Sequence, residues 1–424
     1  MSDLKGKRLL LLGGIRLIKN IVLRAQELGV YVIVTDYLAD SPAKQIADES
    51  YPISTTDVDA VVALAKRLKV DGVFTAYIDS MLTYCRQVCD RLNLPFYATA
   101  EQIDIMTNKD KFKKICVDHG LQVVKEYDLP DRLDDEKLSL IQYPVVVKPV
   151  DYSGGKGIFV CETEKELQER YLDSLSYSKR KKVLVEEYMY GQQVQIYYTI
   201  QDGYVSLSAM SDRYTNKEQR GVAPLPAAHI FPSKYLTVYN NMDHQKAVNL
   251  FNSMNIKNGV LFCQAFMYKD RAHIHDIGFR YSGSQGHKVI RELNEIDTVE
   301  MMIRHALTGK MKGYSIKDMD KPDFDMWVCR LYIIARRGRI AKIKGFDKII
   351  TLPEVFDITP AHDEGDTITQ LGTLDQVVSR IFIKAKTKNQ LADVIEEIKT
   401  TIQVDDEKGE NMLLDLFDTN ELFE

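Results

Sequence analysis

A lysine and a glycine-rich loop follow each other in the second quarter of the chain. The run 143–148 predicts a β-strand that presents Lys148, and the loop after it contains Ser153, Gly154, Gly155, Lys156 and Gly157. Glycines let the main chain approach phosphate oxygens closely, so backbone N–H groups and two lysines could bind a phosphate here. The G-x-x-x-x-G-K-[ST] spacing of a Walker loop is absent. By itself, the segment fits a glycine hairpin with surface lysines equally well.

A second set of candidate residues lies on two segments that alternate like neighbouring strands. Gln264 lies in the first expected strand (260–267) and Asp276 in the second (273–280), with a polar turn between them. An antiparallel pairing places the even positions of the second strand on one face: Ile274, Asp276, Gly278 and Arg280. Gln264 can then face Asp276 across the two strands. Oxygen ligands beside an arginine and a phosphate loop suit Mg²⁺ that carries a nucleoside triphosphate.

Other metal-ligating residue types have simpler explanations. His273 and His275 would fall on the opposite face from Asp276 and lack a third ligand for zinc, so ordinary strand histidines are favoured. Six cysteines are scattered along the chain, and only Cys85 and Cys89 are spaced to stack on one helical face. No further ligands lie near this pair, which favours buried thiols over a metal site.

The first hundred residues alternate apolar strand-like runs with helical periodicity. Strands are expected at 8–13, 31–35 and 72–76, with helices at 17–29, 58–68 and from residue 80 onward. This order predicts a doubly wound parallel sheet with helices on both faces. The Gly13-Gly14-Ile15-Arg16 turn followed by Asp36 resembles a dinucleotide fingerprint only loosely, because two glycines are missing. A doubly wound domain without a dinucleotide is therefore favoured.

The remainder of the chain reads as one lysine-rich helix followed by many strands. The helix spans 108–119 and ends at Gly120, a residue typical of a C-cap. Near the C-terminus, strands are expected at 328–335 and 340–343, joined by a turn at Gly338. A later strand from residue 381 precedes a helix over 388–401.

Length and charge exclude several classes of protein. The chain has 424 residues, 45% of them hydrophobic, and a formal net charge of −5. A weak acidic excess argues against a general nucleic-acid binder. The apolar run at 9–12 is too short for a signal core or a membrane span. We expect a cytoplasmic protein with a small-molecule site and neither a nucleic-acid nor a membrane partner.

Taken in order, these segments resemble the ATP-grasp superfamily over most of the chain. That family places a lysine on a short helix, a second lysine before a glycine lid loop, an adenine-binding hinge, paired acidic strands and an arginine. The resemblance implies that Lys109 and Lys148 bind the phosphates of ATP and that the loop 153–157 covers them. The segment Val185-Glu-Glu-Tyr-Met189, which includes Glu187, looks like the hinge. There Glu186 would accept a hydrogen bond from the adenine amino group, and the Met189 N–H would meet a ring nitrogen.

The sequence departs from the family pattern at two places. The ribose-binding glutamate is replaced, so Gln193 would bind the ribose hydroxyls without charge assistance. The last strand usually reads Glu-x-Asn-x-Arg, whereas here it reads Asp276-Ile-Gly278-Phe-Arg280. Gln264 and Asp276 are twelve residues apart, as in the biotin carboxylase and carbamoyl-phosphate synthetase branches. The resemblance implies one or two Mg²⁺ ions on these two residues, with the missing ligand at Gly278 putting the second ion in question.

The implied fold class is α/β and α+β. A doubly wound parallel-sheet domain (1–105) precedes an ATP-grasp domain (106–315) with a lid subdomain at about 121–187, and a β-rich C-terminal extension (316–424) follows. The implied activity is a carboxylate–amine or carboxylate–thiol ligase that uses an acyl phosphate, with Arg280 and Lys148 as catalytic residues. Two alternatives remain open: a nucleotide-binding module with degraded metal ligands, and carboxyphosphate chemistry like that of carbamoyl-phosphate synthetase. A homodimer is also kept open.

The substrate is less clearly indicated. The C-terminal part resembles the closing region of ATP-grasp amino-acid ligases, which favours an amino acid or another small carboxylate. In the polar connection 211–231, three residues could bind a substrate carboxylate, although a solvated loop is favoured: Arg213, Arg220 and His229. The segment 282–284 (Ser-Gly-Ser), directly after Arg280, is the preferred lining of the acceptor site, its alternative being a turn that ends the strand.

Overall fold

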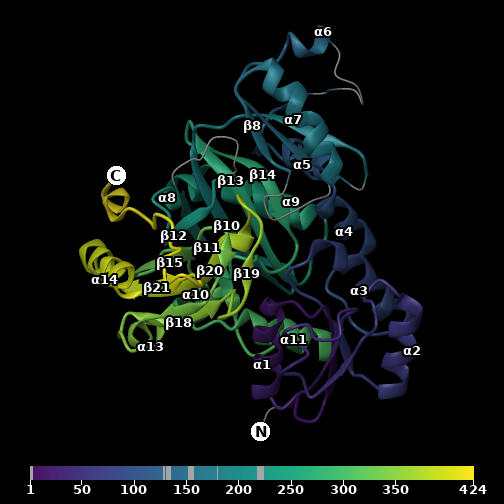
Figure 1. Ribbon diagram of the computed structural model, residues 1–424. Helices are drawn as coiled ribbons and strands as arrows, with labels where there is room; N and C mark the ends of the chain where they lie inside the picture. The colour runs from purple at the N-terminus through teal and green to yellow at the C-terminus, as the bar shows by residue number, and fades with distance from the viewer. Residues whose placement is uncertain (1–2, 128, 130–134, 151–156, 179, 217–223) are drawn as a thin grey trace.

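The fold is given by a computed structural model of residues 1–424. The structure describes the whole chain except residues 1–2, 128, 130–134, 151–156, 179 and 217–223, and the side chains of residues 135 and 136. Figure 1 shows three parts: an N-terminal domain, a subdomain that projects at the opposite end, and a large sheet whose far strands come from the C-terminal region.

The N-terminal domain is built on a parallel sheet with the order β3-β2-β1-β4. Its strands are β1 (Arg8–Leu12), β2 (Tyr31–Thr35), β3 (Glu49–Tyr51) and β4 (Gly72–Phe74). Its helices are α1 (Lys19–Glu27), α2 (Val58–Leu68), α3 (Asp79–Leu92) and α4 (Ala100–Thr107), with a 3-10 turn at Arg16–Ile18. Alternate residues of β1 enter two different cores, Leu9 toward α1 and Leu10 toward α2 and α3. The doubly wound arrangement predicted from the sequence is therefore confirmed.

The motif that loosely resembles a dinucleotide fingerprint forms a self-contained loop. Asp36 accepts hydrogen bonds from the backbone N–H groups of Gly14 (2.8 Å) and Leu38 (2.9 Å). A Cβ atom on Gly14 would lie 1.9 Å from Ser41 Oγ, so only glycine fits there. Both carboxylate oxygens of Asp36 thus hold its own loop together.

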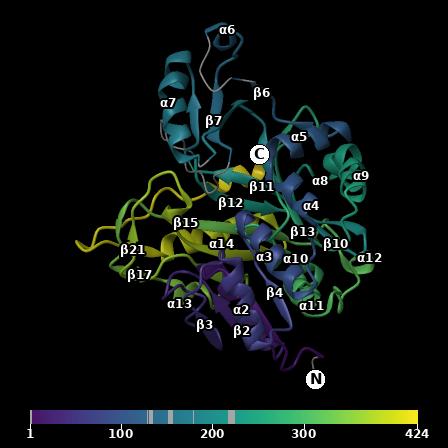
Figure 2. The same ribbon diagram turned by 90° about the vertical axis from the view of Figure 1, so that its right-hand side faces the viewer.

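A small antiparallel sheet forms the projecting subdomain, with the order β6-β9-β7-β8. Its elements are β6 (Glu126–Tyr127), α6 (Asp135–Leu138), β7 (Val145–Pro149), β8 (Phe159–Cys161), α7 (Glu164–Tyr177) and β9 (Val183–Glu187). Figure 2 shows α7 lying along this sheet, and the two share a core that includes Val145, Val147 and Leu167. Helix α5 (Lys109–Asp118) precedes the subdomain, capped by Asn108, and Gly120 follows it at φ +75°.

The central sheet has nine strands in the order β18-β20-β15-β12-β11-β10-β13-β14-β5. These are β5 (Gln122–Val123), β10 (Gln192–Gln201), β11 (Tyr204–Thr215), β12 (Pro226–Phe231), β13 (Gly259–Tyr268), β14 (Arg271–Gly278), β15 (Trp327–Ile334), β18 (Val355–Pro360) and β20 (Val377–Ala385). A two-residue turn joins β13 to β14, with Lys269 and Asp270 both at positive φ, as such hairpins require. The pair of strands predicted there is confirmed.

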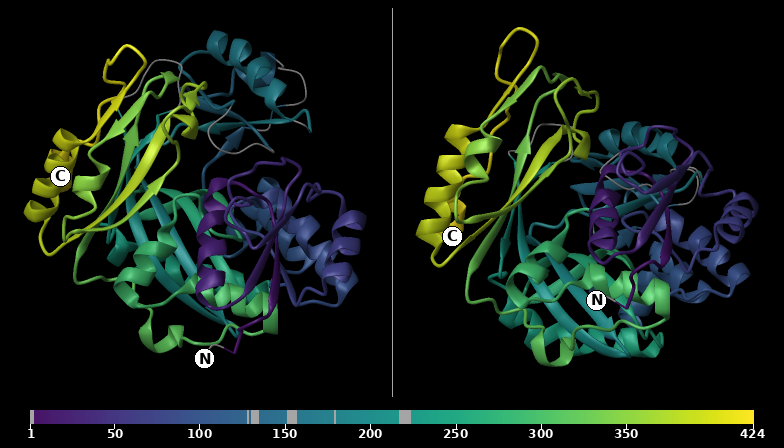
Figure 3. Two further views of the ribbon diagram at one scale, coloured as in Figure 1. Left: turned by 60° about the horizontal axis from the view of Figure 1, so that its bottom comes forward. Right: turned by 90° about the horizontal axis from the view of Figure 1, so that it is seen from below.

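Helices cover the central sheet, and two short strand pairs lie beside it. The helices are α8 (Leu236–Tyr239), α9 (Gln245–Ser253), α10 (Gly286–Asn294), α11 (Thr298–Thr308), α12 (Ile316–Met319), α13 (Phe346–Ile349) and α14 (Lys388–Thr401), with a π-helical turn at Asn240–His244 and 3-10 turns at Leu374–Gln376 and Thr419–Phe423. The small pairs join β16 (Gly338–Arg339) to β19 (Thr367–Ile368) and β17 (Lys342–Lys344) to β21 (Gln403–Asp405). Figure 3 shows α14 packed on the outer side of the C-terminal strands.

Two predictions about strand pairing are wrong. The expected hairpin of 328–335 with 340–343 does not form, because β15 pairs with β12 and β20 instead. The connection 211–231, interpreted as a solvated loop, contains the ends of β11 and β12, which pair with each other. Both errors have one cause: the C-terminal strands do not form a sheet of their own but extend the central one. Within the described part of the chain, no helix combines the length and apolar character needed to cross a bilayer.

Candidate active site

A buried carboxylate holds two lysines at the base of the projecting subdomain. Strands β7 and β9 are paired, which brings Lys148 next to Glu186. The Lys148 Nζ atom lies 2.5 Å from Glu186 Oε2, and the Nζ atom of Lys113 lies 2.6 Å from Glu186 Oε1. All three side chains are more than nine-tenths buried. Sequence reasoning missed Lys113, although it lies one helical turn after Lys109 on the helix already described as lysine-rich.

The charges at this position do not balance. Burial alone would raise the pKa of Glu186, but the ammonium groups of Lys148 and Lys113 lower it to about 2. Burial also lowers the pKa of Lys148, and the nearby Lys109 and Lys113 lower it further against the attraction of Glu186. Lys113 has a second carboxylate partner in Glu126. Three lysines lie near two carboxylates, of which only Glu186 is deeply buried, and the excess positive charge suits an anion such as a polyphosphate.

Lys109 is the first residue of α5, and its charge acts on the same group of buried residues. The Asn108 side chain caps this helix by accepting from the N–H groups of Asp110 (3.1 Å) and Lys111 (3.4 Å). The charge of Lys109 acts on the pKa of both Lys148 and His275. The structure therefore brings the two predicted phosphate lysines together.

Most of the predicted phosphate loop lies outside the described residues, namely Ser153, Gly154, Gly155 and Lys156. The last of its glycines, Gly157, is described and has φ +73°. A Cβ atom there would lie 2.8 Å from Tyr177 Cδ2, so both backbone conformation and space require glycine.

The segment expected to bind adenine connects β9 to β10. Glu186 faces inward, whereas Glu187 is exposed and its N–H donates to Lys125 O (3.0 Å). Met189 is half-buried in the irregular stretch between the strands. The Gln193 side-chain oxygen accepts a hydrogen bond from Arg213. The adenine and ribose contacts assigned to these residues remain predictions.

The expected metal ligands face each other, but the strand alternation around them is interrupted. Gln264 is directly opposite Asp276 in the ladder of β13 and β14. The next pair is Ala265 with Ile274, so His275 lies in a β-bulge, and Ile274 belongs to the core instead of sharing the face of Asp276. The predicted shared face is wrong for Ile274, whereas Asp276 and Gly278 alternate as expected, because the extra residue shifts every earlier side chain of β14 to the other face.

This bulge places His275 among the predicted site residues. Its pKa is lowered to about 3, first by burial and then by the Lys148 charge, while Asp276 and Glu186 oppose the shift and Lys109 adds to it. Its ring lies 5.1 Å from that of Phe266. The charges of Lys109, Lys148 and Asp276 all act on the pKa of His275, which indicates that the three residues lie in one region. Among the described residues, no group of three or more His, Cys, Asp or Glu side chains could hold a metal ion.

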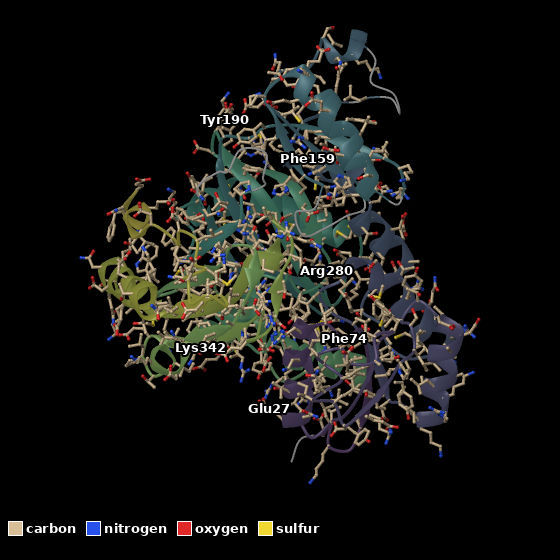
Figure 4. The ribbon with its side chains drawn as sticks, in the orientation of Figure 1. Glu27, Phe74, Phe159, Tyr190, Arg280 and Lys342 are labelled. Carbon is tan, nitrogen blue, oxygen red and sulfur yellow. The ribbon has the colours of Figure 1, made fainter. Side chains whose placement is uncertain are left out.

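Arg280 lies between the central sheet and the N-terminal domain (Figure 4). Its guanidinium forms an ion pair with Asp79, the first residue of α3, and donates to Tyr281 O (2.8 Å). It also lies 5.1 Å from the ring centre of Phe262. The N-terminal domain thus orients the arginine predicted to be catalytic, a partnership that no local sequence pattern indicated.

The residues after Arg280 extend this polar surface along the sheet. The Ser282 Oγ atom accepts from Gln195 Nε2 (2.7 Å), and Ser284 Oγ donates to Gln195 Oε1 (2.9 Å). Gln195 is the ladder partner of Gln264, so these serines lie beside the expected metal ligands. Their assignment to an acceptor site remains a prediction.

Two residues assigned to a solvated loop are instead in the sheet. Arg213 on β11 pairs with His229 on β12, and His229 is almost fully buried. Arg220, the third residue of that set, lies outside the described residues.

Comparison with known proteins gives the same architecture. Residues 108–315 match the family model described as "Carbamoyl-phosphate synthase L chain, ATP binding domain". A formate-dependent phosphoribosylglycinamide formyltransferase from Methanocaldococcus jannaschii is 31% identical over 195 residues, which are 44% of this chain and 49% of that protein. The match thus spans about half the length of this relative.

Two solved structures are similar over almost the whole chain. An L-amino acid ligase from Bacillus licheniformis has a TM-score of 0.76 at 17% identity, covering 95% of this chain and 99% of that one. A phosphoribosylglycinamide synthetase from Anaerococcus prevotii has a TM-score of 0.73 at 19% identity, covering 95% and 100%. At these identities the likeness shows the fold, and it confirms the fold class expected from the sequence.

Proposed function

We propose that this chain, a member of the ATP-grasp superfamily, is an ATP- and Mg²⁺-dependent ligase that joins a small carboxylate to an amine or a thiol. The observation that carries the proposal is the convergence of Lys109, Lys148 and Asp276 around His275. Basic groups and an oxygen ligand at one place are what a metal-bound triphosphate needs.

The residues present fit one Mg²⁺ ion. Asp276 offers a carboxylate and Gln264, directly opposite, an amide oxygen. Mg²⁺ is commonly bound through one or two carboxylates together with phosphate oxygens and water. When bound, the ion would neutralise phosphate charge during transfer.

The chemistry proposed is activation of a carboxylate. A substrate carboxylate oxygen attacks the γ-phosphorus of ATP, the bond to the β–γ bridging oxygen breaks, and an acyl phosphate and ADP result. An amine or thiol then attacks the acyl carbon and phosphate leaves. Lys109 and Lys148 hold the phosphates, while Arg280, oriented by Asp79, neutralises charge on the transferred group.

A substrate panel tests this function. Purified protein with ATP and Mg²⁺ is offered amino acids, hydroxy acids, formate and bicarbonate, and ADP release is measured, with hydroxylamine present to trap an acyl phosphate as a hydroxamate. We expect one class of carboxylate to stimulate ADP release. The Lys148→Met variant should lose this activity, while Lys114→Met, a change at an exposed residue of α5, should keep it. A panel that never raises ADP release above background would refute the ligase.

One observation favours a second candidate, a nucleotide-binding module with weakened metal binding. The family's asparagine ligand is replaced by Gly278, and the Phe262 ring lies against this glycine. That candidate predicts that ATP raises the thermal unfolding temperature equally with Mg²⁺ and with EDTA, without turnover. Bicarbonate-dependent ADP release would instead point to carboxyphosphate chemistry.

A further inference from the structure

Three arginines with no role in the proposed chemistry lie together on the central sheet. This arginine cluster consists of Arg213 on β11, Arg330 on β15 and Arg380 on β20. Arg213 and Arg330 both pair with His229, and Arg380 pairs with Tyr332, two residues after Arg330. Cross-strand partners and residues two apart share a face, so the three arginines project on the same side of the sheet.

The same ladder rows connect the cluster to the expected metal ligands. Gln193 is the partner of Arg213, and Gln195, two residues on, is the partner of Gln264. The cluster and Gln264 therefore share one face. Arg213 and Arg330 lie two and four strands away from Gln264 and two residues along the strand, which at ~4.8 Å per strand and ~3.3 Å per residue is roughly 12 and 20 Å at the backbone.

Some N–H groups of the buried arginines are not hydrogen-bonded to the described residues. Arg330 is fully buried, and its Nη1 atom donates to Ser284 O and to Tyr197 OH (3.4 Å). Its Nε and Nη2 atoms, and Nε of the buried Arg380, have no hydrogen-bond partner among the residues that the structure describes. Both guanidinium groups lie 5.5 Å from the ring centre of Tyr332. Since buried N–H groups are almost always hydrogen-bonded in proteins, these donors call for an acceptor beyond the described side chains, and a bound anion would supply one.

The cluster also has no counter-ion among the described residues. No carboxylate of these residues forms an ion pair with Arg213, Arg330 or Arg380, and Asp357, on the neighbouring strand, is already bound by Lys288 (2.6 Å). Burial lowers the pKa of Arg213 and of Arg380, and the Arg330 charge adds to both shifts. Arg330 and Arg380 are both buried without a carboxylate partner among the described residues. Such charges are costly, and an anion is the group that offsets the cost.

We propose that the arginine cluster binds an anionic group of the substrate, a phosphate ester or a second carboxylate, remote from the carboxylate that is activated. This inference rests on the proposed function, because it names the substrate class of the same site. Planar guanidinium groups bind both oxyanions in a bidentate manner, so the shared chemistry is oxyanion recognition. The substrate would then reach from the ATP phosphates to the cluster, with Gln195, Ser282 and Ser284 along its length.

Binding of simple anions tests the cluster without any need for turnover. Thermal unfolding is followed with phosphate, succinate or acetate at equal ionic strength, with ADP present to occupy the nucleotide site. Phosphate or succinate should raise the unfolding temperature of the unaltered protein by about 2–4 °C more than acetate does. Arg380→Gln should lose this increment, whereas Arg339→Gln, at an exposed arginine of β16, should keep it.

A second variant, Arg330→Met, distinguishes an arginine that binds an anion from one that only stabilises the fold. In buffer without these anions, Arg330→Met should unfold at a temperature equal to or above that of the unaltered protein, because it removes an uncompensated buried charge. A structural arginine would instead lower the unfolding temperature on removal. The proposal is overturned if Arg330→Met is less stable in anion-free buffer while Arg380→Gln keeps the full phosphate and succinate increment.

Turnover then distinguishes the two sources of the anion. ADP release is compared for phosphoglycolate, succinate and alanine, and Arg380→Gln should raise KM at least tenfold for the preferred anionic substrate with kcat nearly unchanged. If alanine is preferred and its KM is insensitive to Arg380→Gln, the substrate assignment is wrong although the ligase stands. If the anion increment is present but no carboxylate stimulates ADP release, the ligase fails and the anion site stands.

Discussion

The ring of Phe262 occupies the space into which a side chain at position 278 would project. A Cβ atom on Gly278 would lie 2.3 Å from Phe262 Cε1, and the two residues are ladder partners on β13 and β14. The same ring lies beside the guanidinium of Arg280. The absence of a side chain at position 278 and the presence of this phenylalanine are therefore one coupled feature.

An asparagine at position 278 should therefore destabilise the protein unless Phe262 is also changed. We expect Gly278→Asn to lower the free energy of unfolding by about 2–3 kcal/mol, because it overpacks a closed position. Adding Phe262→Ala should give a double variant more stable than the sum of the single changes predicts, by about 1 kcal/mol or more. Urea unfolding of the four proteins measures this coupling, and additive changes would contradict it.

Two neighbouring glutamates on β9 allow a test of the buried ion pair with a matched control. Glu186→Gln should cost about 3–5 kcal/mol of unfolding free energy, because it leaves Lys113 and Lys148 buried with a neutral partner. Glu187→Gln, one residue along and exposed, should change it by less than about 0.5 kcal/mol. Similar losses in the two variants would show that Glu186 is not the shared partner of the lysines.

Asp79 is expected to act as a positioning residue for Arg280. Asp79→Asn should lower kcat about tenfold or more while the affinity for ATP stays nearly constant, since the arginine loses its orienting charge. Asp90→Asn, an exposed change on the same helix, is the control. Kinetics with varied ATP and varied carboxylate separate the two effects, and a rise in the KM for ATP with kcat intact would assign Asp79 another role.

Stability should fall in acid partly through His287 on α10. Burial, with the charge of Lys288 next, lowers the pKa of His287 from 6.5 to about 3. The unfolded chain therefore binds a proton below about pH 6.5 that the folded chain refuses, so stability is lost as the pH falls toward 3. One such group contributes up to about 1.4 kcal/mol per pH unit.

His287→Phe, which keeps a ring against Tyr281, should flatten this dependence. Urea unfolding at pH 7, 6, 5 and 4 gives the slope, with His119→Phe on another helix as the control for losing a histidine. An unchanged slope in His287→Phe would show that this residue is protonated equally in both states.

Several helices and strands could be predicted from local sequence alone, because their apolar residues recur with a clear period. The helices 58–68 and 388–401 have the predicted bounds, since their buried positions recur with helical spacing and capping residues precede them. The strand 31–35 also agrees, being a short apolar run with a turn on each side. Lys148 and the strand pair of Gln264 and Asp276 were found the same way, because one strand or one hairpin fixes each of them.

Features that depend on distant contacts could not be read from the sequence. The β-bulge at His275 depends on the register between two strands, and periodicity in one strand cannot indicate an extra residue. Arg213 looked like part of a solvated loop, because the sequence does not show that β11 pairs with β10 and β12, or that the distant β15 continues this sheet beyond β12. The role of Lys113 became visible only in the structure, because its ion-pair partner Glu186 lies far along the chain.

The sequence by itself determined the fold class and the order of many elements, and it predicted which residues would bind phosphate and metal, because these inferences depend on residue type and on short spacing. Tertiary structure alone decided that Asp79 orients Arg280, that the Phe262 ring fills the space beside Gly278, and that three arginines share one face of the sheet. Long-range strand order sets which charges are buried together, and the free energy of those charges depends on their neighbours in space.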